Sequence, residues 1–260
     1  MSKTNVRVIQ ESRPYPHELY LPAGEGPFPL VCITPMLGRL AFLEDLFFER
    51  FFARYFAANG LATAIMDRNI FSFDHSLGLE QLHDYLSATL SRNQALLDHL
   101  LGRGDIDPEK TGSFGMSFGA VANFLWASRD KRLSSHVFVL PGGNIPEIFV
   151  ASEDPLMRSY LRAALARTGY SKTQLCQALR EVFTLDPMEV CGEIDPASIL
   201  MVLARFDRVI PYRYGKQLRE KLGRPETILL PLGHYTSILT IPWLKKTGLN
   251  FFKKKWGLKH

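Results

Sequence analysis

The feature that most constrains this chain is the segment Lys110 to Ser128, which reads KTGSFGMSFGAVANFLWAS. Its centre, residues 115–119, is a G-x-S-x-G sequence that places Ser117 between two glycines. A short β-prone run ends at Phe114, and an apolar, helix-prone run follows the second glycine. Strand, sharp turn and helix in this order are typical of a nucleophile elbow, where small flanking residues leave a serine hydroxyl at the carboxyl end of a strand. The motif alone is a weak signal, because a Gly-Ser turn that opens a helix has the same pattern.

β-prone and helix-prone runs alternate through the first 144 residues and again from residue 195. The predicted strands are 6–10, 18–21, 30–34, 61–66, the run that ends at Phe114, 136–140, 198–203 and 227–231. The predicted helices are 46–58, 79–101, the run after Gly119, 212–222 and a last one that includes 250–255. This alternation predicts an α/β fold, with a mostly parallel central sheet flanked by helices and connected by right-handed crossovers.

The alternation stops between residues 145 and 194, which hold two helical patterns and no convincing strand. The second pattern opens with Ser171 and Gln174, spaced as in a capping box. We interpret residues 145–194 as a small helical cap or lid inserted over the carboxyl edge of the sheet, so that residues 1–144 and 195–260 form the core domain. The alternative is an ordinary crossover helix with a longer connection.

Composition fits an ordinary globular chain, because 46% of the residues are apolar and 22% are charged. The net charge of +5 is mild, and we expect no nucleic-acid partner. Much of the excess is local to the last 16 residues, which include Lys245, Lys246, Lys253, Lys254, Lys255 and Lys259. We interpret these lysines as a solvated helix face, with a site for anionic surfaces as the alternative.

The three cysteines, Cys32, Cys176 and Cys191, form neither a C-x-x-C motif nor a zinc pattern. Cys32 lies in an apolar, strand-like run and is expected to be a core thiol. The first residues contain no hydrophobic signal region, and no apolar run reaches the length of a membrane span. We therefore expect a soluble, cytoplasmic protein without a membrane span.

A serine hydroxyl is a poor nucleophile at neutral pH, and histidine is the residue best suited to take its proton. In an open parallel sheet, that histidine has to reach the carboxyl ends of the strands. The sequence contains seven histidines: His17, His75, His83, His99, His136, His234 and His260. His234 follows a predicted strand and Gly233, which makes it the candidate base, and His75 is the alternative because it also lies in a loop after a strand.

The candidate acids are Asp186, Asp195 and Asp207. Asp195 precedes its strand and therefore lies at the wrong edge of the sheet, and Asp186 is placed to start a helix. Asp207 directly follows the strand 198–203, so it is the preferred acid. The alternative for Asp207 is a surface turn residue paired with Arg205 or Arg208.

The order Ser117, Asp207, His234 along the chain resembles the α/β-hydrolase superfamily over nearly the whole length. The sequence is similar to the dienelactone-hydrolase and small esterase or peptidase-like branch. The motifs that carry the resemblance are IDP (106–108) before the elbow, DRVIP (207–211) and Gly233-His234. The resemblance implies a Ser-His-Asp triad that needs neither a metal nor an organic cofactor.

An oxyanion hole needs two peptide donors. The N–H of Phe118, the residue after the nucleophile, is one by position. The resemblance places the second in the loop after strand 30–34, where the family often has His-Gly and this sequence has Thr34-Pro35. Because Pro35 has no N–H, Met36 is the chosen donor, with Leu37 in reserve.

The expected activity is hydrolysis of a small-molecule carboxylic ester through an acyl-enzyme intermediate. A thioesterase, a serine peptidase with the same triad and a non-catalytic binding protein on the same fold remain alternatives. Aromatic residues near the expected site favour a partly apolar substrate, although they could equally be core packing: Phe71, Phe73, Phe118 and Phe149. The sequence does not predict the oligomeric state.

Overall fold

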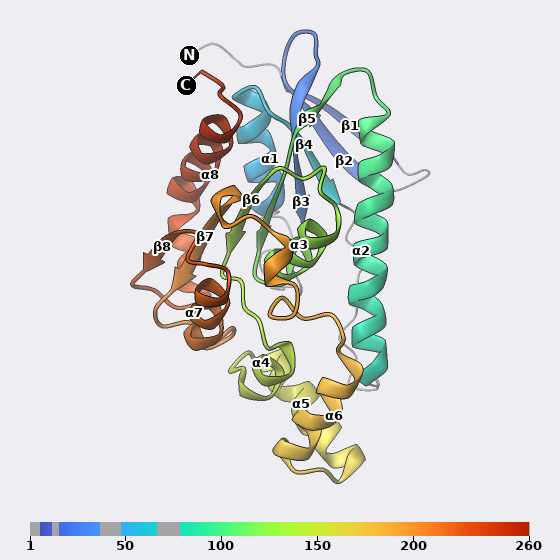
Figure 1. The fold of residues 1–260 in the computed structure, drawn as a ribbon, viewed down its shortest axis with the longest axis vertical. Coiled ribbons are helices and arrows are strands. Elements are labelled where there is room, and N and C mark those ends of the chain that lie inside the picture. The colour runs from blue at the N-terminus through green and yellow to red at the C-terminus, as the bar shows by residue number, and fades with distance from the viewer. Residues whose placement is uncertain (1–5, 12–15, 37–47, 67–78, 260) are drawn as a thin grey trace.

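A computed structural model describes residues 6–11, 16–36, 48–66 and 79–259 of the chain (Figure 1). Within these residues, eight strands form one sheet in the order β1-β2-β4-β3-β5-β6-β7-β8. The strands are β1 (Arg7–Glu11), β2 (His17–Leu21), β3 (Phe28–Thr34), β4 (Ala62–Met66), β5 (Ile106–Met116), β6 (Ser135–Val139), β7 (Ile199–Ala204) and β8 (Glu226–Leu230). β2 runs antiparallel to both β1 and β4, and all the other pairs are parallel. The predicted fold class, a mostly parallel α/β sheet, is confirmed.

Helices cover both faces of this sheet. They are α1 (Phe48–Ala58), α2 (Leu79–Leu101), α3 (Phe118–Arg129), α4 (Ile145–Ala151), α5 (Pro155–Thr168), α6 (Lys172–Val182), α7 (Tyr212–Lys221) and α8 (Ile241–Lys255). Short 3-10 turns follow at η1 (Cys191–Glu193), η2 (Pro196–Ser198) and η3 (Thr236–Thr240). None of the described helices combines the length and the apolar character that crossing a membrane requires.

The central strands are mostly apolar because helices bury them from both sides. Every residue of β3, β4, β6 and β7 is buried. Successive side chains of a strand face opposite sides, so Val31 of β3 packs with α1 and α8, whereas its neighbour Cys32 packs with α2 and α3. Cys32 is fully buried, which confirms it as a core thiol.

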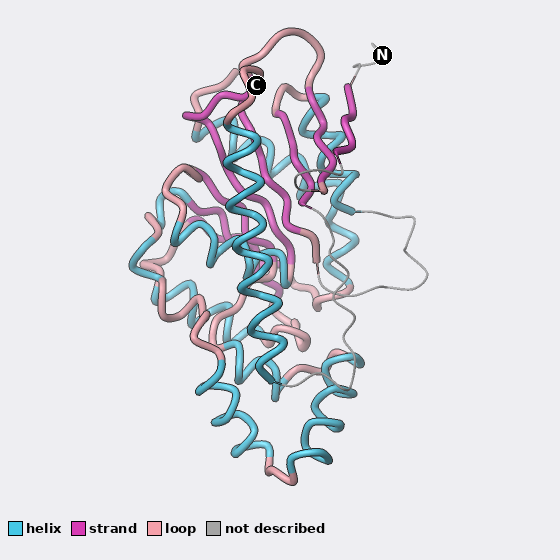
Figure 2. Tube along the Cα trace, turned by 90° about the vertical axis from the view of Figure 1, so that its right-hand side faces the viewer, coloured by secondary structure: helices cyan, strands magenta, loops and turns pink. Residues whose placement is uncertain are grey.

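Residues 145–182 form a group of three helices, α4, α5 and α6, at one end of the molecule, away from the strands (Figure 2). They share an apolar cluster of their own that includes Phe149, Tyr160 and Leu175. The capping box predicted at Ser171 and Gln174 is present at the start of α6. The expectation of two helical segments was wrong, because the first divides into α4 and α5.

The division between α4 and α5 follows from Asp154-Pro155. Pro155 has no N–H to continue a helix from α4, but it is well suited to the first turn of a new one. Asp154 caps that turn, because its carboxylate accepts a hydrogen bond from the Met157 N–H at 2.9 Å. β5 begins at Ile106, so the IDP motif (106–108) lies within the elbow strand itself, and the register of β5 against β3 shifts between Phe28 and Leu30.

Candidate active site

Ser117 lies between β5 and α3 in a backbone conformation that residues with a side chain rarely adopt. Its φ is 53° and its ψ is −123°. The turn is held on both sides: the Ser117 N–H donates to the Val139 carbonyl of β6 at 2.8 Å, and the Ser117 carbonyl accepts from Ala120 N–H at 2.9 Å. A strained serine at a strand-to-helix turn is the geometry of a nucleophile elbow.

The two glycines of the motif are required by close backbone approaches. A Cβ on Gly115 would lie 2.3 Å from the carbonyl oxygen of Gly119, and one on Gly119 would lie 2.2 Å from the carbonyl oxygen of Thr34. Neither position has room for a side chain, since the obstructing atoms are backbone. The G-x-S-x-G pattern is therefore the sequence that allows α3 to start against the ends of β5 and β3.

Asp207 and His234 reach the same edge of the sheet as Ser117. β5, β7 and β8 are parallel strands, and the three residues follow the carboxyl ends of these strands at Met116, Ala204 and Leu230. Carboxyl ends of parallel strands meet at one edge, so residues separated by 117 and 27 positions in the sequence come together.

The three side chains form one chain of hydrogen bonds. Ser117 Oγ lies 3.0 Å from His234 Nε2, and His234 Nδ1 lies 2.7 Å from Asp207 Oδ2. A carboxylate only accepts, so Nδ1 carries the proton in this arrangement and Nε2 presents its lone pair to the serine hydroxyl. The imidazole is thus oriented to accept the Ser117 proton.

Asp207 is held rigidly beneath the imidazole. Its other oxygen, Oδ1, accepts hydrogen bonds from the N–H groups of Val209 and Ile210, at 2.8 and 2.9 Å. Its side chain is only 3% exposed. The two alternative salt-bridge partners are engaged elsewhere: Arg205 lies over the Tyr212 ring, and Arg208 pairs with Glu153.

The other candidate residues lie elsewhere. The Asp186 carboxylate accepts from the N–H groups of Asn144, Ile145 and Met188, and so orders the start of α4. Asp195 caps η2. His75, the alternative base, lies outside the described residues, as do Leu37, Phe71 and Phe73.

The two expected oxyanion donors differ in their surroundings. Phe118 is the first residue of α3, where an N–H has no partner within the helix. Met36 follows β3, and its N–H donates to Oε1 of the buried Glu49 at 3.2 Å. In this conformation the Met36 N–H is therefore engaged by a carboxylate of α1, a contact that sequence reasoning missed.

Solved structures with the same arrangement of elements identify the fold. A puromycin-hydrolyzing peptidase of Mycobacterium tuberculosis matches with a TM-score of 0.69 and 15% identity over 98% of this chain and 40% of its own. An acetyl xylan esterase from Paenibacillus sp. R4 matches with a TM-score of 0.64 and 16% identity, over 97% of this chain and 88% of its own. The 2,6-dihydroxy-pseudo-oxynicotine hydrolase matches with a TM-score of 0.60 and 16% identity, over 96% of this chain and 67% of its own.

This chain has the α/β-hydrolase fold. It spans 40% of the length of the puromycin-hydrolyzing peptidase. No family model matches the sequence, and no curated protein matches it either.

The elbow of this α/β-hydrolase fold rests on a buried polar network that the sequence did not reveal. Thr34 Oγ1 donates to Asn123 Oδ1 at 2.5 Å and accepts from Asn93 Nδ2 at 2.8 Å. Asn123 Nδ2 in turn donates to the Phe114 carbonyl at 2.8 Å. The end of β3 is thereby tied to α2, to α3 and to the elbow strand, which fixes the strand end that precedes Met36.

A tyrosine links the His234 loop to the start of α5. The Tyr235 hydroxyl donates to Asp154, the residue that caps α5, and burial together with this carboxylate raises the pKa of Tyr235. The ring meets the His234 imidazole edge to face at 5.7 Å. The group formed by α4, α5 and α6 therefore contacts the residue beside the candidate base directly.

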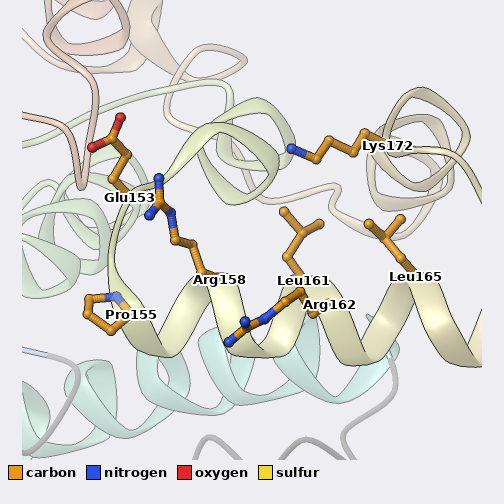
Figure 3. Close-up of a pocket in the computed structure, with 7 residues that line it drawn as sticks. All are labelled: Glu153, Pro155, Arg158, Leu161, Arg162, Leu165 and Lys172. Atoms are coloured by element: carbon orange, nitrogen blue, oxygen red, sulfur yellow. The ribbon is translucent and has the colours of Figure 1, made fainter.

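Residues 153–172 of this helical group line a cavity of about 500 Å³ (Figure 3). Its walls combine apolar and basic side chains with one carboxylate, from Glu153, Pro155, Arg158, Leu161, Arg162, Leu165 and Lys172. Ser117, Asp207 and His234 do not line it. Phe149, expected near the site, packs edge to face on Tyr160 at 5.0 Å and belongs to the apolar cluster shared by α4, α5 and α6. Phe118 packs against Tyr85, with ring centroids 5.7 Å apart.

Proposed function

We propose that this chain is a serine hydrolase that cleaves small-molecule carboxylic esters, with Ser117 as nucleophile, His234 as general base and Asp207 as the acid that orients it. The observation that supports this most is the continuous hydrogen-bond chain from Ser117 through His234 to Asp207, at 3.0 and 2.7 Å. An activated serine beside an oriented imidazole is the arrangement that acyl transfer requires.

The proposed reaction has two steps. Ser117 Oγ attacks the ester carbonyl while His234 Nε2 takes its proton, and the same proton then passes to the departing alcohol. Water activated by His234 attacks the acyl-enzyme and releases the acid. Asp207 stays ionised throughout and stabilises the imidazolium that forms in each step.

Two peptide N–H groups are proposed to stabilise the developing oxyanion. Phe118 N–H, at the start of α3, is the first, where the helix dipole favours negative charge. Met36 N–H is the second. To serve, it has to exchange its present hydrogen bond with Glu49 for one with the substrate, because a single N–H directs its proton to one strong acceptor at a time. Glu49 would hold the Met36 peptide in the resting enzyme, before the substrate binds.

Residues 145–194 are proposed to act as a cap over the carboxyl edge of the sheet. The support is the contact between Tyr235 and Asp154, together with a backbone hydrogen bond from Glu153 N–H to the Arg208 carbonyl at 2.8 Å. Both contacts join the insertion to the loops that carry His234 and Asp207. The apolar and basic cavity within it offers walls for the part of a substrate remote from the ester.

A fluorophosphonate probe, which reacts with activated serines, tests the proposal. We expect it to label the wild-type chain and the Ser91→Ala control, whose serine lies exposed on α2, but not Ser117→Ala. Failure to label the wild type would favour a non-catalytic binding protein on this fold. Labelling that persists in Ser117→Ala would assign the nucleophile elsewhere.

The substrate class follows from a second measurement. Matched ester, thioester and aminoacyl-amide substrates with the same acyl group are compared by kcat/KM, with Ser117→Ala as the blank. We expect esters of small or medium acyl groups to be the best. A preference for the thioester or the amide would support the thioesterase or peptidase alternatives, which use the same triad.

A further inference from the structure

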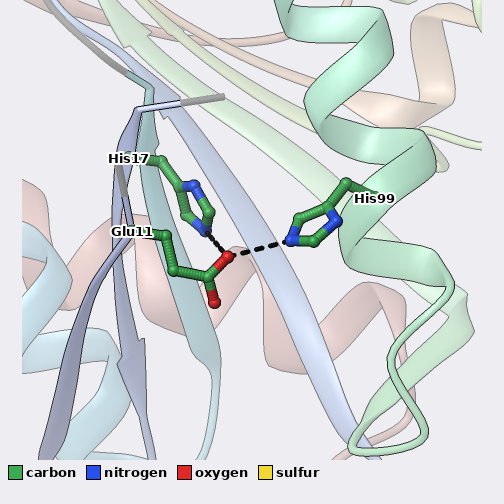
Figure 4. Close-up of side chains that lie close together, drawn as sticks. All are labelled: Glu11, His17 and His99. Atoms are coloured by element: carbon green, nitrogen blue, oxygen red, sulfur yellow. Dashed lines mark hydrogen bonds and ion pairs between the residues drawn. The ribbon is translucent and has the colours of Figure 1, made fainter. Parts of the chain in front are cut away.

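A second cluster of chemically active side chains lies at the opposite end of the sheet from β8. Glu11 ends β1, and His17 begins β2 directly opposite it in the antiparallel register. His99 comes from the last turn of α2, which packs beside this hairpin (Figure 4). β4 and β3 separate β2 from β5, the strand that leads to Ser117, so this cluster takes no part in the proposed hydrolysis.

Both imidazoles direct Nε2 toward the same carboxylate oxygen. His99 Nε2 lies 3.0 Å from Glu11 Oε2, and His17 Nε2 lies 4.0 Å from it. The three atoms all lie within 4.8 Å of one another. The rings themselves meet edge to face at 5.9 Å. Three electron-donating atoms from three elements thus surround one small volume.

Lone pairs that converge in this way need hydrogen atoms or a metal ion between them. Two neutral imidazoles and one carboxylate are a common ligand set of zinc, which binds nitrogen and oxygen at about 2.0–2.2 Å in a tetrahedron. Tetrahedral ligand atoms at that radius are roughly 3.3 Å apart. The observed separations bracket this value, so rotations of the side chains suffice to bring all three atoms into contact with one ion.

We propose that Glu11, His17 and His99 bind one divalent transition-metal ion, with zinc as the best match, and that a water molecule completes the tetrahedron. The proposed occupant follows from the donor set, because imidazole suits zinc and its first-row neighbours, whereas calcium and magnesium prefer oxygen ligands alone. The site is reached from solvent on the side of Glu11 and His99, whose side chains are 23% and 31% exposed. His17 is fully buried and forms its floor.

A neighbouring arginine orients the carboxylate for this role. Arg103 Nη1 donates to the other oxygen of Glu11, Oε1, at 3.2 Å, while its remaining donors bind Asp105 at 2.9 and 3.0 Å. Oε1 is thereby occupied, and Oε2 is left as a single ligand atom facing both histidines. In metal sites, side chains that hydrogen-bond to a ligand in this way fix the orientation of that ligand.

The ion would cross-link β1 and β2 to the end of α2 and so stabilise the fold. A ligand that binds only the folded state stabilises it by mass action, so stability should rise with the free metal concentration. Each ligand comes from a separate element, and the ion would therefore join residues 11 and 17 to residue 99 across the edge of the sheet.

The experiment uses the full chain without an affinity tag, stripped of metal by a chelator. Zinc is titrated in competition with a chromophoric chelator, and cobalt is added separately to record the visible absorption of a tetrahedral site. The test variants are Glu11→Gln and His99→Gln, both partly exposed, which avoids disturbing the buried His17. His83→Gln is the matched control, a histidine of the same helix that contacts Thr184 instead.

We expect the wild type and His83→Gln to bind one equivalent of zinc and to give a tetrahedral cobalt spectrum. Zinc should raise the thermal midpoint of both relative to the metal-free chain. Each test variant should remain folded by circular dichroism, bind zinc at least tenfold more weakly and lose the midpoint shift. If the wild type does not bind zinc stoichiometrically, the site is refuted and the three side chains form only hydrogen bonds and ion pairs. Equal binding by His99→Gln and the wild type would place the metal elsewhere.

Discussion

His136, a histidine that takes no part in the proposed chemistry, makes the stability of this protein depend on pH. It lies near the start of β6, and only 2% of its surface is exposed. Its Nδ1 lies 3.1 Å from Ser113 Oγ, and its ring stacks on Phe138 with centroids 5.5 Å apart. Burial lowers the pKa of His136 to about 3, because a charged imidazole would lose its hydration in this position.

The sign and size of the effect follow from the two pKa values. In the unfolded chain the imidazole takes a proton below a pKa of about 6.5, whereas the folded protein leaves His136 neutral down to about pH 3. Between these limits the unfolded chain binds one more proton, so the free energy of unfolding falls as the pH falls. From pH 7 to pH 5 the loss is about 2 kcal/mol, since each pH unit well below 6.5 corresponds to 1.36 kcal/mol and the units near 6.5 to less.

Urea unfolding at pH 7 and pH 5 measures this loss, followed by tryptophan fluorescence and circular dichroism. His136→Asn is the comparison, because an amide keeps a polar atom toward Ser113 but does not titrate. Both proteins share every other titrating group, so the difference between their pH dependences isolates His136. We expect the wild type to lose about 2 kcal/mol more than the variant. Equal losses would refute the reasoning, whatever the variant's stability at pH 7.

Three further predictions follow from the site and the core. Asp207→Asn should lower turnover by about 10⁴-fold with an unchanged thermal midpoint, because an amide can donate to Nδ1 and so favours the wrong imidazole tautomer; unchanged turnover would move the acid elsewhere. Gly119→Ala should lower both the thermal midpoint and fluorophosphonate labelling, since its Cβ would lie 2.2 Å from the Thr34 carbonyl oxygen; a normal midpoint with normal labelling would contradict the steric argument. Burial raises the pKa of Cys32, so Ellman's reagent should react with it only after unfolding, and rapid labelling of the native chain at Cys32, mapped by mass spectrometry, would count against this.

The sequence predicted the positions of the sheet and of the three central side chains because both depend on local patterns. Buried parallel strands such as β3 and β7 are short continuous apolar runs, which are visible without any knowledge of their neighbours. The rule that ligands meet at the carboxyl ends of such strands then selects residues by their place after a strand, which is how Asp207 and His234 were chosen.

The contacts that the sequence did not predict join side chains across the fold. Whether the Met36 N–H is available depends on Glu49, which reaches it from α1, and no spacing in the sequence encodes that approach. The Tyr235 contact with Asp154 likewise depends on where the start of α5 lies. Asn93 looks like an ordinary polar residue of an amphipathic helix, yet it is buried against Thr34. Such pairs form only after the elements have assembled.

The position of β8 in the sheet has a consequence for the order in which the protein loses its properties on denaturation. β8 comes last in the sheet and pairs with β7, and Leu229 within it is 48% exposed, whereas the strand that leads to Ser117 lies in the interior. Partial opening usually begins where little apolar surface is buried. Fraying of β8 would carry His234 away from a hydroxyl that has not moved. We therefore expect urea to abolish the reactivity of Ser117 at concentrations where most of the tryptophan fluorescence is still that of the native core.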